Sequence, residues 1–183
     1  MIWELRCARI NSFASLVAVD RADSRAGMFA TKGAVQDWAH RPAVEFFVDP
    51  RKKKQPPRAN VIHMKMGALV LDAKAKLALG AFLSKFGQLL ELHLKGDGEI
   101  LWFYNVTNIV KCVDEAKSER DENGMITDEA FDESNVPSEA AVFKDPKMGV
   151  IRIYVNDAGR AEIERLASDA GLTGVECGIP QAF

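Results

Sequence analysis

The sequence predicts an α+β fold in which a mixed, largely antiparallel sheet with a central hairpin carries two main packed helices. Three observations lead to this prediction. Strand-like segments fill the first half, two central strands are joined by a short glycine turn, and two segments place apolar residues at helical spacing. A chain of 183 residues can bury a substantial core, and this length fits a single domain over residues 1–183.

The first helix is expected over residues 72–86. Asp72 precedes it, and its carboxylate can accept hydrogen bonds from the unpaired amides of the first turn. Gly87 stands where a left-handed residue would end the helix. An apolar stripe recurs at helical spacing and consists of Leu71, Ala75, Leu79, Phe82 and Phe86.

A hairpin is expected over residues 88–105. A three-residue loop at residues 96–98 would set Lys95 opposite Glu99. The same register collects six large apolar side chains on one face, namely Leu90, Leu92, Leu94, Ile100, Trp102 and Tyr104. The other face carries Leu101 and Phe103 and is only partly polar, so we expect something to cover part of it.

Further elements are expected toward both ends of the chain. Alternating or apolar patterns predict strands at residues 3–9, 43–49 and 60–66, and the proline-rich, charged residues 50–58 predict an exposed loop. A strand at 150–155, a helix at 157–170 and a short strand at 174–178 follow. Asn156 or Asp157 begins this helix and Gly171 ends it. Its inner face is expected to be Ile163, Leu166, Ala167 and Ala170.

Composition limits the class of protein. An apolar fraction of 48% and a charged fraction of 27% are those of a globular protein, and a net charge of −2 gives no sign of a nucleic-acid partner. No apolar run approaches the roughly 20 residues of a membrane-spanning helix, and the start "MIWELRCARI" lacks the pattern of a signal peptide. The three scattered cysteines suit reduced thiols, so we expect a cytoplasmic location.

No motif nominates a catalytic residue, a metal site or a cofactor. His40, His63 and His93 are isolated from one another, and neither a phosphate-binding glycine loop nor a nucleophile elbow is present. The basic run within residues 51–58 lacks interleaved aromatic residues. We interpret it as a solvated loop and expect no nucleic-acid partner.

The segment 114–139 is the least ordinary part of the chain. It holds ten acidic side chains against Lys117 and Arg120, a local charge of −8. One interpretation is a long solvated connection. The other is a docking surface for a basic partner, because carboxylates presented beside aromatic residues steer encounter and then offer anchors.

The order of these motifs is similar to that of a known family. The helix in "VLDAKAKLALGAFLSKFGQLLEL" leads to an aromatic strand ending in "YNVTNIVKCVDEAKSE", and a later strand and helix lead to "AGLTGVEC". This arrangement resembles the eleventh immunity-protein family of bacterial polymorphic toxin systems, formerly described only as a domain of unknown function. The resemblance covers residues 60–178, and residues 1–59 match only loosely.

The resemblance implies a non-enzymatic protein that binds a cognate antibacterial toxin and blocks it stoichiometrically. It also makes the acidic segment useful, because an acidic inhibitor imitates the substrate of a basic toxin that attacks nucleic acids. The expected contact residues are Asp114, Glu115, Glu119, Asp121, Glu122, Asp128, Glu129, Asp132 and Glu133. The remaining residues of the family motifs are Asn105, Thr107, Ser118, Gly171 and Gly174, for which turn and cap roles in the fold are the favoured interpretation.

Two alternatives remain open at this stage. One is a small-molecule enzyme whose pocket combines dispersed carboxylates with His93. The other is an adaptor or structural subunit, for which a homodimer formed through an apolar patch at Leu101 and Phe103 would be the sign. The sequence names neither the toxin nor the oligomeric state.

Overall fold

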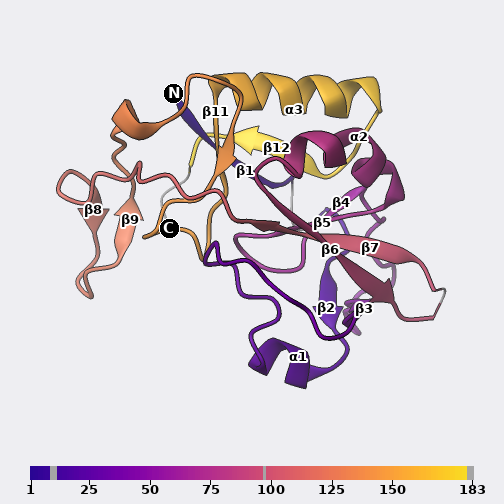
Figure 1. Ribbon diagram of the computed structural model, residues 1–183. Coiled ribbons are helices and arrows are strands. Elements are labelled where there is room, and N and C mark those ends of the chain that lie inside the picture. The colour runs from indigo at the N-terminus through magenta and orange to yellow at the C-terminus, as the bar shows by residue number, and fades with distance from the viewer. Residues whose placement is uncertain (9–11, 97, 181–183) are drawn as a thin grey trace.

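Two sheets and two long helices form the frame of the protein, which confirms the α+β class. The computed structural model describes residues 1–8, 12–96 and 98–180 (Figure 1). Its helical elements are α1 (Arg21–Arg25), α2 (Ala73–Leu83), the 3-10 turn η1 (Glu133–Asn135) and α3 (Asp157–Asp169). Its strands are β1 (Ile2–Cys7), β2 (Leu16–Ala18), β3 (Ala43–Phe46), β4 (Val61–Ile62), β5 (Leu69–Leu71), β6 (Gly87–Leu94), β7 (Ile100–Val106), β8 (Glu119–Arg120), β9 (Ile126–Asp128), β10 (Val142–Phe143), β11 (Tyr154–Asn156) and β12 (Val175–Gly178).

The larger sheet curls until its two edges meet. Its strand order is β2-β3-β6-β7-β5-β4, and only the β3–β6 pair is parallel. The amide of Leu16 on β2 donates to the carbonyl of His63, immediately after β4, over 2.8 Å. The interior of this small barrel is filled by apolar side chains that include Val44, Val70, Leu92 and Phe103.

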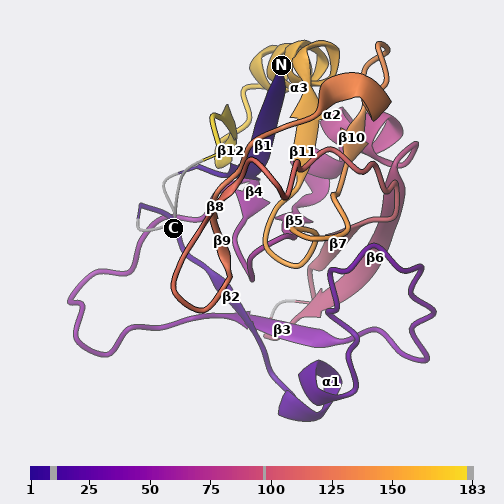
Figure 2. The same cartoon turned by 90° about the vertical axis from the view of Figure 1, so that its left-hand side faces the viewer.

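The smaller sheet packs against the barrel through the helices. Its order is β10-β11-β1-β12, and every pair is antiparallel. Figure 2 shows α3 at the top, over this sheet, and the barrel strands β2 and β3 below. The core between the two sheets joins Leu5 of β1, Leu79 of α2, Tyr104 of β7 and Ile163 of α3. Residues from the first 59 positions and from the later region therefore share one core.

The central hairpin is present, but its predicted register is wrong by one residue. Leu92 lies opposite Leu101 and His93 opposite Ile100, whereas the register that sets Lys95 opposite Glu99 would place Leu94 opposite Ile100. The physical reason is that apolar side chains pack on both faces of the hairpin, although Glu91 and His93 stay exposed on one of them. Leu90, Leu92 and Leu94 join Leu101 and Phe103 inside the barrel, whereas Leu89, Trp102 and Tyr104 face the helices. Asp97, within the expected turn, lies outside the described residues.

This register also changes two smaller expectations. Leu101 and Phe103 are buried, so they form no exposed patch for a homodimer. Lys95 pairs with Glu45 on β3 at 2.9 Å, and Glu99 approaches Arg58 at 3.6 Å, so the predicted Lys95–Glu99 pair at the turn is wrong.

The expected helix starts are confirmed. The Asp72 carboxylate accepts from the amide of Ala75 at 2.8 Å, and the side chain of Asn156 accepts from the amide of Gly159 at 2.8 Å. Gly171 has a φ of +56° and follows the end of α3 as predicted. Gly87 does not end α2, which stops at Leu83. It begins β6 instead, where a Cβ would lie 2.3 Å from the carbonyl oxygen of Asn105.

Three predicted strands are clearly shorter than expected, and the one predicted at 43–49 ends at Phe46. The strand predicted at residues 150–155 begins only at Tyr154, because residues 148–152 turn back through bonds from the amides of Ile151 and Arg152 to the carbonyl of Met148. The strand predicted at 60–66 is reduced to β4. Within the described part of the chain, no helix is long and apolar enough to cross a membrane.

Candidate functional site

The acidic segment is tied to the body by an apolar inner side. It contains the β8–β9 hairpin, at the left of Figure 1, and the 3-10 turn η1. The ring of Phe131 meets that of Tyr154 edge to face, with centroids 5.6 Å apart, and Ile126 and Val136 pack on the same cluster. The amide of Asp114 also donates to the carbonyl of Ala130 at 2.9 Å. The segment is therefore an ordered surface rather than a loose connection.

A buried ion-pair network fixes the segment from below. The side chain of Glu129 is 2% exposed and pairs with the guanidinium of Arg152, which also donates to Glu4 over 2.7 Å. Burial raises the pKa of Glu129, and Arg152 opposes that rise. Glu4 continues the network to Arg6, and Arg6 to Glu176 on β12. Glu129 thus points inward and does not belong to the exposed carboxylates with which the sequence analysis grouped it.

Asp145 is a second internal anchor, and sequence reasoning missed it. Its side chain accepts from the amides of Cys112 and Val113 at 2.8 and 2.9 Å and from the amide of Lys147 at 2.7 Å. It is 1% exposed. The available signal was the charged pair Lys144–Asp145 inside an otherwise apolar stretch, because such charges are buried only with partners.

Five of the remaining carboxylates have structural partners at the surface. Asp114 pairs with Lys117 at 2.9 Å, and Glu115 with Lys147 at 3.2 Å and Arg120 at 3.3 Å. The other three serve turns and termini: Asp121 accepts from the amides of Asn123 and Met125, Asp132 from the amide of Ser134, and Glu133 meets the N-terminus. These contacts hold the surface in one shape.

Glu119, Glu122 and Asp128 differ from the other carboxylates. They are exposed, and none of them has an ion-pair or side-chain hydrogen-bond partner within residues 1–8, 12–96 and 98–180. Glu119 on β8 lies directly opposite Asp128 on β9. Like charges at opposite positions of an antiparallel pair destabilise it. The hairpin therefore keeps an unfavourable carboxylate pair exposed to solvent.

Replacing one member of this pair should stabilise the free protein. Glu119→Gln keeps the shape of the side chain and removes the repulsion, so we expect the free energy of unfolding in urea to rise by about 0.2–1 kcal/mol. Glu122→Gln is the matched control, because Glu122 lies in the turn between β8 and β9 and pairs with no described residue across the hairpin. Equal effects of the two substitutions would contradict the cross-strand repulsion.

A polar hollow adjoins the hairpin. It has a volume of about 260 Å³ and is lined by Asp114, Glu115, Asp132, Lys111, Val113 and Asn135. Two cations lie near these three carboxylates. Lys111 lines the hollow itself, and Lys117 forms an ion pair with Asp114. The structure thus brings together Asp114, Glu115 and Asp132, while Glu119 and Asp128 stand on the projecting hairpin.

The family-motif residues all make internal contacts. Asn105 donates to the carbonyl of Ala34 and to Gln88, and the amide of Thr107 donates to the carbonyl of Phe86. The hydroxyl of Ser118 donates to the carbonyl of Asp114 and accepts from the amide of Ala130. Gly174 has a φ of +84° and passes so close to β4 that a Cβ would lie 2.2 Å from the carbonyl oxygen of Val61.

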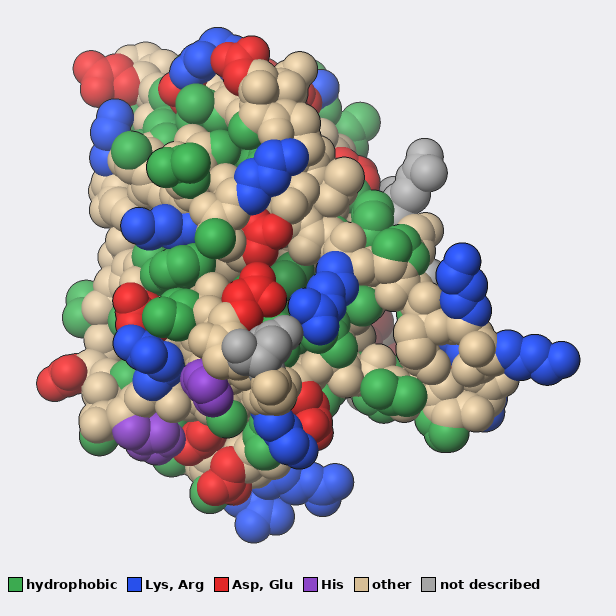
Figure 3. Space-filling model, turned by 90° about the vertical axis from the view of Figure 1, so that its right-hand side faces the viewer, with side chains coloured by type: hydrophobic (Ala, Val, Ile, Leu, Met, Phe, Trp, Pro, Cys, Tyr) green, Lys and Arg blue, Asp and Glu red, His purple; other side chains and the backbone are tan. Residues whose placement is uncertain are grey.

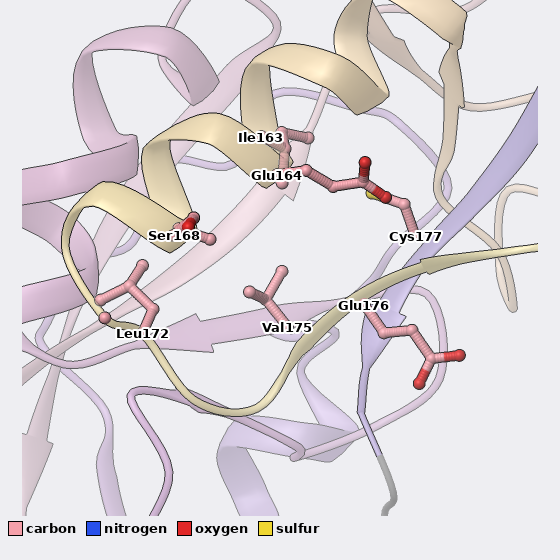
Figure 4. Close-up of a pocket in the computed structure, with 9 residues that line it drawn as sticks. Ile163, Glu164, Ser168, Leu172, Val175, Glu176 and Cys177 are labelled. Carbon is pink, nitrogen blue, oxygen red and sulfur yellow. The ribbon is translucent and has the colours of Figure 1, made fainter.

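A larger hollow lies elsewhere, between α3 and β12. Figure 4 shows Glu164 and Ser168 on the helix above Val175 and Cys177 on the strand, around a volume of about 530 Å³. Burial, with Glu164 nearby, raises the pKa of Cys177 to about 12. The thiol is therefore protonated at neutral pH and is a poor nucleophile.

The histidines do not gather into a site. His93 is exposed on β6 and lies outside this hollow, His40 pairs with Asp23 at 2.9 Å, and burial lowers the pKa of His63. Over the residues that the structure describes, no three His, Cys, Asp or Glu side chains are grouped to hold a metal ion.

No protein-family model matches this chain, and no curated protein matches it. The resemblance to the eleventh immunity-protein family stays a prediction that rests on the motifs quoted above.

Proposed function

We propose that this protein is a cytoplasmic immunity protein that binds a cognate antibacterial toxin stoichiometrically, without catalysis. The observation that carries the proposal is the carboxylate pair Glu119–Asp128, which lies opposed and exposed on the β8–β9 hairpin. A cation from a partner placed between these side chains removes their repulsion. Relief of this repulsion therefore contributes favourably to the free energy of binding a partner.

The anchoring of the surface supports a protein partner. Phe131, Glu129 and Asp145 hold the segment from beneath, so its exposed carboxylates are ordered before a partner arrives. A preordered surface loses less conformational entropy on binding. The carboxylates also spread over a hairpin and the turn that follows it, which suits a broad basic protein surface better than a single small ion.

Charge supports a basic toxin as the partner. Acidic surfaces speed the encounter with basic proteins and suppress wrong partners. Toxins that attack nucleic acids carry basic substrate sites, and an acidic inhibitor that covers such a site imitates the charge of its substrate. The resemblance to the immunity family points to the same class of partner.

Growth rescue tests this function. The product of the adjacent reading frame is co-expressed with the protein, and growth and co-purification are scored together. We expect the wild-type protein to restore growth and to form a one-to-one complex. The variant Glu119→Lys/Glu122→Lys/Asp128→Lys should lose both, because it reverses the three unpaired charges and leaves the turn-forming Asp121 intact.

The matched control is Asp37→Lys, which reverses an exposed carboxylate that also has no ion pair within the described residues. It lies outside the acidic segment and should behave as wild type. Full protection by the triple variant, or equal loss in the Asp37 control, would contradict a role for the hairpin carboxylates.

A further inference from the structure

A second charged surface lies on the loop between β3 and β4. Residues 51–58 carry five cations: Arg51, Lys52, Lys53, Lys54 and Arg58. Figure 3 shows this loop as the lobe at the right, with its basic side chains directed into solvent. It is far along the chain from the acidic segment.

The loop is braced rather than loose. The side chain of Gln55 accepts from the amide of Asp49 at 3.2 Å and donates to the carbonyl of Asp49 at 3.1 Å. The guanidinium and the amide of Arg51 both donate to the Asp49 carboxylate. Arg58 stacks on the ring of Phe46, with its guanidinium carbon 4.3 Å from the ring centre. These contacts fix both ends of the basic run.

Three of the five cations make no ion pair with a described residue. Arg51 is taken by Asp49 and Arg58 stacks on Phe46, but Lys52, Lys53 and Lys54 make no ion pair with any described residue. All three are exposed. Two described carboxylates lie at the base of the loop. Asp49 is paired with Arg51, which lowers the pKa of that carboxyl, and Glu99 lies 3.6 Å from Arg58. The loop therefore presents a concentrated positive charge.

Aromatic side chains lie beside this loop, Phe47 from immediately after the preceding strand and Phe13 from a distant part of the chain. Phe13 and Phe47 line a hollow of about 350 Å³ together with Arg51, Lys52 and Gln55. Phe47 is 51% exposed, although it is a large apolar side chain. Stacking surfaces and Lys52 thus meet in one concave place, and Lys53 and Lys54 follow Lys52 directly along the loop.

We propose that this surface binds single-stranded nucleic acid, with backbone phosphates on Lys52, Lys53 and Lys54 and a base stacked on Phe47. Proteins that bind single strands without sequence preference combine these two elements, a positive track and exposed aromatic rings. In a duplex the bases stack on one another, so no base face is free to stack on the ring of Phe47. Phe47 lines a concave hollow, whereas an aromatic residue that inserts into a membrane projects from the surface. This inference revises the expectation of no nucleic-acid partner and does not depend on the proposed function.

The test is fluorescence anisotropy with a labelled oligothymidine of about 15 nucleotides. We expect dissociation constants of about 1–100 μM near physiological salt, and a log–log salt dependence with a slope of about −2, as three phosphate contacts on a single strand give. The variant Lys52→Ala/Lys53→Ala/Lys54→Ala should bind about ten-fold or more weakly and lose most of that slope. Phe47→Ala should bind about ten-fold more weakly with the slope retained, and Phe47→Tyr should bind as wild type.

The matched control removes three exposed cations elsewhere, in Arg21→Ala/Arg25→Ala/Lys32→Ala, and should bind as wild type. Thermal unfolding confirms that each variant is folded. Three results would overturn the proposal: no binding by the wild-type protein, equal loss in the control and the lysine variant, or equal affinity for duplex DNA with no effect of Phe47→Ala. Binding to vesicles of anionic phospholipid in preference to the oligonucleotide would overturn it as well.

Discussion

Replacing Arg152 by leucine should lower the free energy of unfolding by about 3–5 kcal/mol, because the substitution leaves two buried carboxylates without their shared cation. Arg152 is 4% exposed at its side chain and lies between Glu4 and Glu129. Glu4 keeps Arg6 as a partner, but no other cation pairs with Glu129 within the described residues. Chemical denaturation with urea measures the loss.

The loss in the free energy of unfolding of Arg152→Leu should depend on pH in a defined direction. Burial already raises the pKa of Glu129 above its usual 4.5, and loss of Arg152 raises it further. The folded state then binds a proton that the unfolded chain has released, so stability falls as pH rises through this range. The difference from wild type should be largest at neutral pH and smallest near pH 4.5.

Two further variants make the test specific. Arg165→Leu removes an arginine that is 56% exposed and pairs with Glu162 and Asp169, so it should cost far less stability than Arg152→Leu. Arg152→Leu combined with Glu129→Leu should be more stable than Arg152→Leu alone. A small, pH-independent loss of stability in Arg152→Leu would contradict the claim that Arg152 holds these buried carboxylates.

Lys144→Met should also destabilise the fold strongly. Its ammonium donates to the carbonyls of Thr31, Gly67 and Gly149, each over 2.6 Å, and the residue is fully buried. A buried carbonyl left without a donor costs about 1–3 kcal/mol, so we expect a loss of about 3 kcal/mol or more. Lys65→Met is the matched control. Among the described residues Lys65 donates only to the carbonyl of Phe29, so this substitution should cost much less stability.

The stability of the wild-type protein relative to Lys144→Met should rise with pH. Burial, with a contribution from Lys65, lowers the pKa of Lys144 from 10.5 to about 7, and the unfolded chain keeps its proton to the higher value. Since the unfolded state binds more protons between these pH values, stability increases across this window. A loss no greater than in Lys65→Met, or a difference that is flat with pH, would contradict this account of Lys144.

Local elements were predictable because their signals are local. The caps at Asp72 and Asn156 and the glycine after α3 follow from the chemistry of helix ends, which three or four residues determine. The hairpin itself followed from two strand patterns around a glycine turn. Its register did not, because residues 100–104 are apolar on both faces and either face could meet Leu90, Leu92 and Leu94. Only packing on two sides decides which side chains meet.

Tertiary partners account for what the sequence left undetermined. Glu129 looked like its exposed neighbours because its partner, Arg152, lies 23 residues away and on a turn that had the pattern of a strand. Phe13 reaches the basic loop only through the fold. The acidic charge of residues 114–139 was visible in the sequence, but the cross-strand position of Glu119 and Asp128 required the structure.

Calorimetric titration of the cognate toxin into the wild-type protein and into Glu119→Gln tests the central claim most directly. The account predicts one-to-one binding by the wild-type protein, and weaker binding by Glu119→Gln although that variant is the more stable in isolation. Glu122→Gln should have the stability of the wild-type protein in isolation and should lose less affinity for the toxin than Glu119→Gln. Unchanged affinity in Glu119→Gln would contradict the claim that the opposed carboxylates of the hairpin bind the partner.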